Sequence, residues 1–449
     1  MYTIDRDTVV TPQLAMRFAK RHQNEAIRRF DMLDDYYCGR HEILRRSKEN
    51  DLANNRLVCN HAKYISDMAI GYLIGTPVKY SSDADITQLL DWLQKADAAT
   101  QDADLAKDAS VFGTAFELVY LSSDERPYPK LAVIDPRNAF VVYDDTVEHA
   151  PVFGVRYYPR YDLDGRLIGY QCSVYTDAAV TDFSCGVGFE LIGEAVIRLN
   201  PFGMITLNEV FNNEEQQGDF EQQISLINAY NTLQSDRVND KEQFVKAILL
   251  ISGQILGDTE EEEMEKWDSL RRNGLLMLEA GSKAEWLTRQ FDEASVELLR
   301  KSLENDIHKY SAVPCMTDES FAANASGVAM RYKLLAFEQM TGIKQRYFQE
   351  GLRYRLKLFC SLMAVKGLAP ADADSIDIVF TRNLPANETE LAQVAASLGV
   401  EVSNETLLSI LPFVSDPAEE AAKVEEQKEA QAQRQTELLL NTPIEDADG

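Results

Sequence analysis

The chain has 449 residues, more than one hydrophobic core usually serves, so its length predicts two or more domains. Its 73 acidic and 45 basic residues give a formal net charge of -28, while 45% hydrophobic and 26% charged residues are ordinary for a globular protein. This charge disfavours tight binding of nucleic acid, because such binding relies on Lys and Arg neutralising phosphates. The negative net charge is still compatible with DNA that slides past the protein without being bound tightly.

The cysteines and the N-terminal residues bear on the compartment. The six cysteines form no CxxC motif and no dense framework, which is typical of reduced thiols in a cytosolic compartment. The start, MYTIDRDTVVTPQLAMRF, lacks an apolar core of signal-peptide length, and no stretch reaches ~18 uninterrupted apolar residues. The sequence therefore predicts neither secretion nor a membrane span.

The first part of the chain is predicted to be helical. Thr11 is a candidate N-cap followed by Pro12 at the first helical position, and apolar residues recur at helical spacing as far as Leu33. A second helix is predicted in CNHAKYISDMAIGYLIG and ends at Gly75. Further helices are predicted around ITQLLDWLQKA and DADLAKDASVF.

From Ala115 the apolar pattern alternates with a period near two. Short runs rich in Val, Ile, Tyr and Phe predict strands, namely AFELVYL, KLAVIDP, NAFVVYD, VFGVRYYPRY, LIGYQCSVYT and FELIGEAVIRL. DLDG, from Asp162 to Gly165, predicts one hairpin turn. The predicted fold class is α+β with an antiparallel sheet.

Two long helices are predicted to bracket a small mixed segment. The first lies in NNEEQQGDFEQQISLINAYNTLQSDRVND, and the second lies in FDEASVELLRKSLENDIHKYSAVP. Between them we predict strands in FVKAILLISGQIL, LLMLEA and AEWLTRQ, and a helix in DTEEEEMEKWDSLRRNG. One stripe of the second helix carries Phe291, Leu298, Leu299, Leu303 and Ile307. Such a stalk has too little surface of its own to be stable, so we expect oligomerisation to cover it.

After this pair comes SAVPCMTDESFAANASGVAMRYKLLAFEQ, in which Thr317 to Gly327 is rich in Ser, Ala, Asn and Gly, as in a mobile loop. A long helix is predicted from about Gly327 into the 360s, and IDIVFTRNLP is predicted as a strand that returns to the main sheet. Beyond Asn387 we predict helices and an acidic tail. The long helix is basic, with Arg331, Lys333, Lys344, Arg346, Arg353, Arg355 and Lys357. These positive charges would pair with an acidic neighbour in a ring or face phosphates.

Few motifs indicate chemistry. No GxxxxGK[ST] phosphate loop occurs. Cys38, His41, Cys59 and His61 could form a zinc site, but the spacing of the last two points them to different helix faces, and ordinary packing is the favoured interpretation. No cofactor or metal is predicted.

Clustered carboxylates could serve a metal-dependent nuclease. Asp135, Asp144 and Asp145 in VIDPRNAFVVYDDT are the candidates. They stand where strand-ending turns are expected and lack a partner lysine on an adjacent strand, so structural turns are favoured. The acidic run Glu260 to Glu263 suits the first turn of a helix, where the helix dipole stabilises anions, although a docking role is open.

Several longer segments resemble one protein family. YYCGRHEIL, NHAKYISDMAIGYLIGTPVKY, DASVFGTAFELVY, AVIDPRNAFVVYDDT, FGVRYY, NNEEQQGDFEQQISLINAYNTLQSDRVND and ASGVAMRYKL together resemble portal proteins of long-tailed double-stranded DNA bacteriophages, in the branch common among phages of Gram-positive hosts. The resemblance runs in order from about Tyr36 to Pro385.

The resemblance implies a ring of twelve non-enzymatic subunits at one capsid vertex, through which genomic DNA is packaged and ejected. It implies a virion protein that is assembled in the host cytoplasm. The regions it implies are a wing in residues 1–217, stem helices in 218–243 and 291–311, a clip in 244–290, a channel loop in 312–326, a wing helix and returning strand in 327–385, and a crown with the acidic tail in 386–449.

The resemblance also implies sites and partners. The channel loop would present Thr317, Asp318, Ser320, Phe321, Asn324 and Ser326 to passing DNA. The long helix would add channel or inter-subunit charges at Arg331, Lys333, Lys344 and Arg346. The clip would dock partners through Glu260, Glu261, Glu262, Glu263, Trp267 and Trp286. The implied partners are the terminase large subunit, a head-completion adaptor, and the major capsid and scaffolding proteins. Alternatives are another ring-forming head-tail connector or the nuclease.

Overall fold

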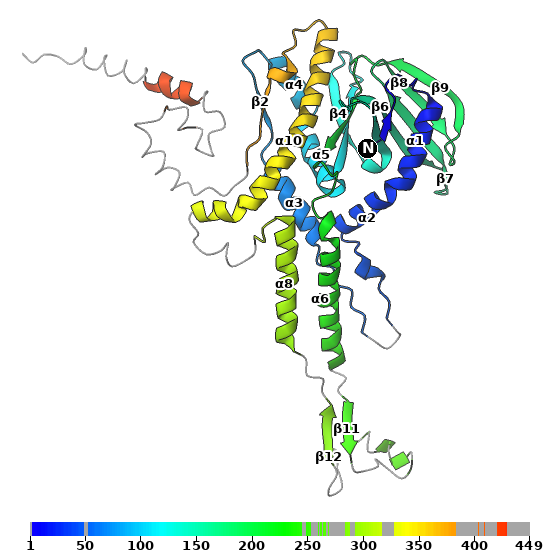
Figure 1. Cartoon of the computed structure of the whole chain (residues 1–449), viewed down its shortest axis with the longest axis vertical. Coiled ribbons are helices and arrows are strands. Elements are labelled where there is room, and N and C mark those ends of the chain that lie inside the picture. The colour runs from blue at the N-terminus through cyan, green and yellow to red at the C-terminus, as the bar shows by residue number, and fades with distance from the viewer. Residues whose placement is uncertain are drawn as a thin grey trace, which may run out of the picture. The chain divides into compact units, whose positions relative to one another are not determined.

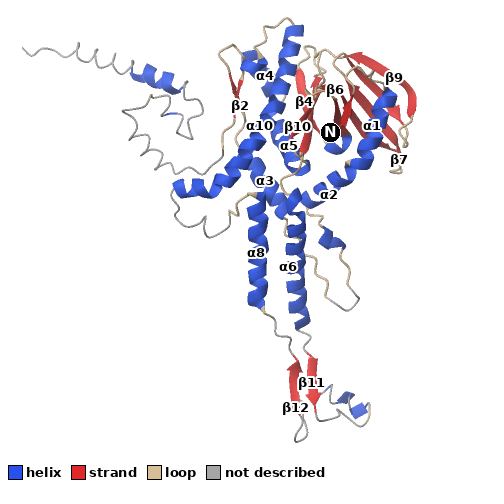
Figure 2. Cartoon of the chain, viewed as in Figure 1, coloured by secondary structure: helices blue, strands red, loops and turns tan. Residues whose placement is uncertain are grey.

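The computed structural model describes residues 2–48, 53–244, 248–252, 283–287, 292–316, 327–382 and 420–428, with isolated positions at 259, 261, 262, 264, 265, 268, 403 and 408. Contacts divide the chain into two units. One comprises Met1–Pro314 and Ala336–Arg382, and the other comprises Cys315–Leu335 and Asn383–Gly449. The first unit contains both helices and strands (Figure 2), which confirms the predicted α+β class.

The N-terminal helices follow the predicted signals closely. They are α1 (Pro12–Glu25), α2 (Ile27–Tyr37), the short η1 (Glu42–Arg45), α3 (His61–Ile74), α4 (Thr87–Lys95) and α5 (Ala98–Phe112). The Thr11 hydroxyl accepts a hydrogen bond from the Leu14 amide at 3.2 Å, which confirms the predicted cap. The run to Tyr37 is divided between α1 and α2 at Ala26, and α3 is capped by Gly75 as predicted.

A six-stranded sheet forms one half of the β structure. Its strands are β1 (Tyr2–Ile4), β5 (Ala139–Asp144), β6 (Pro151–Tyr161), β7 (Leu167–Tyr175), β8 (Ala179–Cys185) and β9 (Leu191–Leu199), in the order β1-β5-β6-β7-β8-β9. β1 runs parallel to β5, and all other neighbours are antiparallel. Ala15, Met16 and Ala19 of α1 share a core with Phe140 and Phe153, so the amphipathic face of α1 covers one face of this sheet.

A second sheet, of three antiparallel strands, lies between helices. Its order is β10 (Leu207–Phe211), β3 (Thr114–Leu121) and β4 (Pro129–Ile134). Leu105 of α5 and Phe359 of the long helix α10 (Gly327–Val365) meet Val210 in one core. A Cβ on Gly351 of α10 would lie 2.5 Å from Val210 Cγ2. Glycine inside this helix therefore allows close helix–sheet packing.

The last strand differs from its prediction. β13 (Asp377–Val379) pairs antiparallel with β2 (Lys79–Ser81), with Ile378 opposite Tyr80, in a separate two-stranded sheet. The predicted return to the main sheet is therefore wrong. Periodicity predicted the strand, but its partner lies almost 300 residues earlier in the sequence and leaves no local signal. Short 3-10 turns complete this part of the chain: η2 (Pro136–Asn138), η3 (Glu221–Gln223) and η4 (Ala373–Ser375).

The two helices predicted as a stalk lie side by side in Figure 1. They are α6 (Ile224–Phe244) and α8 (Glu293–Ser311). Between them in sequence, β11 (Ile248–Ser252) pairs antiparallel with β12 (Lys283–Leu287), with Leu249 opposite Trp286. The predicted strand LLMLEA and the predicted helix that follows Asn387 lie outside the described residues, except that residues 420–428 are helical.

Candidate functional site: the α6–α8 pair and its junction with the body

Charged residues join α6 to α8. Arg237 of α6 donates through Nε to Glu293 Oε1 at 2.7 Å, and its Nη1 lies 3.1 Å from Glu297 Oε2 on α8. Arg300 of α8 donates back to the Tyr230 hydroxyl at 3.2 Å. Hydrogen bonds from Arg300, together with the nearby Arg237, lower the pKa of Glu297 to about 2. The Glu297 carboxylate is therefore ionised at any ordinary pH and pairs with Arg237 across the two helices.

The apolar residues of α8 divide between two environments. Ile307 is fully buried, whereas Leu298 and Leu299 are 72% and 50% exposed. Tyr310, near the end of the helix, is also exposed. Among the described residues of the predicted apolar stripe, a single chain therefore buries Ile307 and leaves Leu298 and Leu299 exposed to water.

A polar ladder fastens α6 to the body, by which we mean elements β1 to β10 with residues 336–382. Asn231, Ser235 and Asn239 occur every fourth residue, on one helix face, and all three are buried. Asn231 Oδ1 accepts from the Cys59 amide at 2.8 Å, Ser235 Oγ accepts from the Leu57 amide at 2.9 Å, and Asn239 Oδ1 accepts from the Asn55 amide at 2.7 Å. The backbone amides of Asn55, Leu57 and Cys59 thus find their hydrogen-bond acceptors on side chains of α6. We missed this ladder from sequence, although the polar spacing of four was its signal.

The candidate zinc residues are engaged in this junction. His41 Nε2 lies 2.9 Å from the Tyr36 carbonyl oxygen, and Nδ1 lies 2.8 Å from Asn231 Nδ2, so both ring nitrogens have partners. The His61 ring packs edge-on against Tyr230, and burial lowers the pKa of His61 to about 4. In the part of the chain that the structure describes, no three His, Cys, Asp or Glu side chains are placed to hold a metal ion. Hydrogen bonds and packing therefore account for His41 and His61, while Cys38 is exposed.

The candidate nuclease carboxylates occupy turns. Asp135 caps η2 and pairs with Arg137 at 2.6 Å. Asp144 is fully buried and accepts from the Thr146 hydroxyl at 2.8 Å and the Ala150 amide at 3.2 Å. Burial raises the pKa of Asp144, but these hydrogen bonds outweigh it and leave the pKa below its ordinary value.

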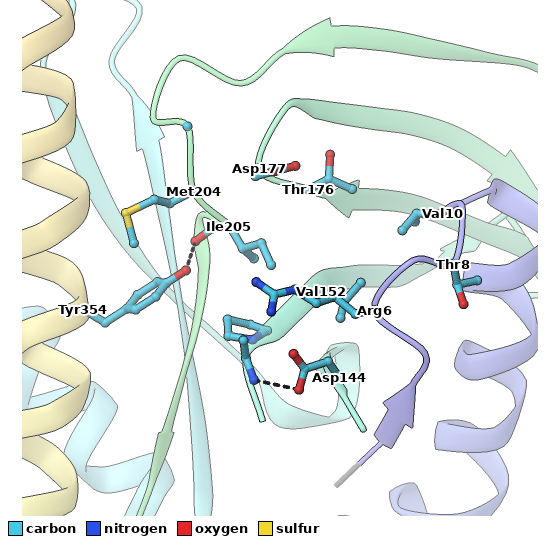
Figure 3. A pocket seen from close by; sticks show the side chains of 13 residues that line it. Arg6, Thr8, Val10, Asp144, Val152, Thr176, Asp177, Met204, Ile205 and Tyr354 are labelled. Carbon is cyan, nitrogen blue, oxygen red and sulfur yellow. Dashed lines mark hydrogen bonds between the residues drawn. The ribbon is translucent and has the colours of Figure 1, made fainter. Parts of the chain in front are cut away.

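Asp144 also lines a cavity of about 490 Å³, shown in Figure 3, where the guanidinium of Arg6 lies near it. Asp145 is exposed on the following turn. A two-metal centre requires carboxylates that converge on one point. Here a cation accompanies Asp144 and hydrogen bonds order the turn, so the arrangement suits a structural role.

The basic residues of α10 are largely engaged within the chain. Lys344 is buried and lies 2.5 Å from Asp219 Oδ2, so its charge is neutralised inside the subunit. Arg346 is exposed. No side-chain environment is described for Arg331 or Lys333, although both lie within α10.

Sequence reasoning missed a fully buried ion cluster. Arg355 Nη1 lies 2.6 Å from Asp102 Oδ1 of α5, and its Nη2 lies 2.6 Å from Glu117 Oε1 of β3. Burial raises the pKa of Asp102 to about 6, against the lowering effect of Arg355. One sequence signal for this cluster was available: Arg355 lies among Leu352, Leu356 and Phe359, on the apolar face of the helix.

Most of the predicted contact residues lie outside the described part of the chain. These include the loop residues Thr317, Asp318, Ser320, Phe321, Asn324 and Ser326, and the tip residues Glu260, Glu263 and Trp267. Glu261 and Glu262 are exposed, and Trp286 lies on β12 with no side-chain environment described. Their predicted contacts stay predictions.

The comparison with known families identifies the class of protein. Residues 17–434 match the family described as "Phage portal protein, SPP1 Gp6-like", so the chain belongs to the phage portal proteins. This confirms the resemblance drawn from the sequence. Portal proteins are structural components of the virion with a role in DNA packaging. In the described residues, no helix is both long and apolar enough to cross a membrane.

Two relatives show how far the similarity extends. The chain is 25% identical over 415 residues to the portal protein of Bacillus phage SPP1, in an alignment that covers 86% of this chain and 78% of that relative. It is 23% identical over 446 residues to the portal protein of Clostridium phage phiCD119, with 91% of this chain and 95% of that relative covered. The similarity therefore spans most of all three proteins.

Proposed function

We propose that twelve copies of this chain form a closed ring at one capsid vertex, and that double-stranded DNA passes through its centre during packaging and ejection. Membership of the portal family supports a role in packaging. The observation that carries the ring is the α6–α8 pair. In a single chain this pair exposes Leu298, Leu299 and Tyr310 to water. Covering an apolar surface of this kind is energetically favourable. The same pair in a neighbouring subunit is the cover that a ring would provide.

We assign the α6–α8 pair as the stem and residues 244–290 as the clip. The two stem helices are joined by the ion pairs of Arg237 and by the hydrogen bond from Arg300 to Tyr230, and the stem is fastened to the body by the Asn231 ladder. These contacts give a rigid support for the small β11–β12 hairpin. Residues 1–217 and 327–385 are assigned as wing, and 386–449 as crown.

We assign residues 312–326 as the channel loop. Small neutral side chains suit a surface past which DNA slides, because each strong phosphate contact would add to the free energy that movement must overcome. The net charge of -28 per chain works in the same direction, since an acidic wall repels phosphate. Arg346, exposed on α10, is available to an acidic neighbour in the ring.

We further propose that the clip docks the terminase large subunit during packaging and a head-completion adaptor afterwards, while other surfaces meet the capsid and scaffolding proteins. Glu261 and Glu262, exposed in this segment, support a polar docking surface. The motor would then reside in the terminase, in keeping with the lack of a phosphate loop in this sequence.

Native mass spectrometry with negative-stain imaging tests the ring directly. The expected result is closed rings of 50.6 kDa chains with a central hole. A stable monomer or dimer would contradict the proposal.

The channel loop has its own test. Asn324→Lys is expected to impair packaging while rings still assemble, because the added cation would grip passing phosphates. Asn324→Ser, which keeps the side chain small and neutral, is the matched control. If Asn324→Lys packages DNA as well as Asn324→Ser does, the loop assignment is wrong.

A further inference from the structure

Two buried cysteines meet between the strands β7 and β8. Cys172 and Cys185 are each 1% exposed, and their Sγ atoms lie 3.4 Å apart. Both are free thiols. The strand register sets Cys172 opposite Phe183 and Cys185 opposite Tyr170, so the two cysteines are diagonal neighbours on one face of the sheet.

The surrounding backbone holds the two thiols in this position. A Cβ on Gly169 would lie 2.2 Å from the Cys185 carbonyl oxygen, so glycine lets the end of β8 approach β7 closely. Phe189 stacks on Tyr170 with ring centroids 4.7 Å apart and closes the core beside the pair. Diagonal residues are usually farther apart than directly opposed ones, so the short sulfur–sulfur contact requires both side chains to turn toward each other.

The contact between the two thiols couples their acidities. It lowers the pKa of Cys185 and raises the pKa of Cys172, and either sulfur can be the donor. The thiolate is the nucleophilic form of cysteine. Either sulfur can be the donor in this contact, so either cysteine can attack an oxidant first and the other can then follow it.

We propose that Cys172 and Cys185 form a redox pair that closes to an intramolecular disulfide when the protein meets a small peroxide. A virion component encounters two redox environments, the reducing cytosol in which phage proteins are made and the oxidising surroundings of a released particle. The inference rests on the protein being a virion component and on the distance between the two sulfur atoms. It does not depend on the proposed channel or on the ring size.

The chemistry balances with hydrogen peroxide as the oxidant. The sulfur of one cysteine attacks a peroxide oxygen, the O–O bond breaks, and that cysteine becomes a sulfenic acid as the first water leaves. The sulfur of the other cysteine then attacks the sulfenic sulfur, the S–O bond breaks, and a second water leaves. The thiols lose two electrons and two protons, and the peroxide is reduced to two waters. A peroxide is small enough to reach a buried pair through minor opening of the strands, whereas a bulky disulfide reagent is not.

The sequence offers a direct readout. Trypsin cleaves after Arg166 and Arg198, and the peptide between them contains Cys172 and Cys185 as its only cysteines and no internal Lys or Arg. The folded full-length protein would be treated with hydrogen peroxide, denatured, alkylated and digested. The expected peptide carries no alkyl group, is two hydrogen atoms lighter than the reduced form, and regains two alkylation sites after dithiothreitol.

The result that overturns the proposal is a peptide that carries two alkyl groups while the exposed Cys38 in the same sample is oxidised. Closure only in a sample unfolded in urea would overturn it as well, because the native geometry would then play no part. Both outcomes are read on the unmodified chain and do not depend on whether a variant folds.

Single substitutions test the sulfenic acid step. In Cys172→Ser and in Cys185→Ser no disulfide can close, so a sulfenic acid on the remaining cysteine should accumulate and be trapped by dimedone. Cys360→Ser, at a buried cysteine in the other core, is the matched control and should close the pair as the unmodified chain does. No trapping at the remaining cysteine of either single variant would contradict the proposed reaction with peroxide.

Discussion

The body and the α6–α8 pair use charge in opposite ways. In the body, Arg355 is fully buried with Asp102 and Glu117, and burial raises the pKa of Asp102 to about 6. On the helix pair, Glu297 contacts two arginines in partial contact with water, and its pKa falls to about 2. The Arg355 cluster of the body is thus enclosed in a core, whereas the helix pair keeps the Glu297 ion pairs at a surface and leaves leucines uncovered. This difference agrees with the proposal that neighbouring subunits cover the helix pair in a ring.

The largest expected effect comes from breaking the buried cluster. Arg355→Met leaves Asp102 and Glu117 buried without a counter-charge, which should reduce the free energy of unfolding by about 3–5 kcal/mol. Urea denaturation measures this loss. Lys357→Met is the matched control: Lys357 pairs with Asp374 in water, 3.1 Å away, and its loss should cost less than about 1 kcal/mol. Equal stability of the two variants would show that the buried cluster contributes no more than a surface pair.

The pH dependence of stability separates the two regions next. Asp108 of α5 is buried, and burial raises its pKa to about 7 despite the opposing effect of Lys107. The folded state therefore binds this proton more tightly than the unfolded state does. Its contribution to stability is fully present below the unfolded pKa, near 3.9, and is lost as the pH rises through about 7.

Replacing the Asp108 carboxyl tests the sign of its pH-dependent contribution to the unfolding free energy. Asp108→Asn should flatten the decline of the unfolding free energy between about pH 4 and 7 by up to about 1.4 kcal/mol per pH unit. Urea titrations at several pH values measure the slope. Glu297 has the opposite sign, because a lowered pKa stabilises above the unfolded value and that contribution is lost only in strong acid. An unchanged slope in Asp108→Asn would mean that Asp108 titrates normally in the folded protein.

A smaller loss of unfolding free energy is expected at the junction between the body and the α6–α8 pair. Asn231→Ala leaves the Cys59 amide and the His41 ring without their partner in a buried site, which should cost about 1–3 kcal/mol. Thr232→Ala, on the exposed side of the same helix turn, is the control and should be near neutral. Limited proteolysis of segment 55–59 gives a local readout, and equal protection in both variants would argue against the ladder.

The smallest effect on folding, and the clearest on assembly, is expected at Leu298. Because this side chain is 72% exposed, Leu298→Ser should change the unfolding free energy of a single chain by no more than about 0.5 kcal/mol. It should nevertheless shift the mass distribution from rings toward smaller species, while Leu298→Met preserves the apolar surface and the rings. Unaffected assembly of Leu298→Ser would remove the helix pair from the proposed interface.

The sequence by itself determined the local elements and the family. Thr11 with Pro12 placed the start of α1, Gly75 placed the end of α3, and alternation from Ala115 placed most strands of both sheets. These features depend on neighbouring residues, because caps, turns and side-chain periodicity act within a few positions. Segments longer than ten residues, kept in order, carried the resemblance that the family match confirmed.

Only the tertiary structure decided which distant groups meet. The pairing of β13 with β2, the cluster around Arg355 and the ladder on Asn231 each join residues far apart in sequence. The contact of Cys172 with Cys185 depends on a register between strands that no local pattern specifies. Periodicity shows which face of an element is buried, but the partner of that face follows from how the whole chain packs, because burial and pairing are satisfied by the fold as a unit.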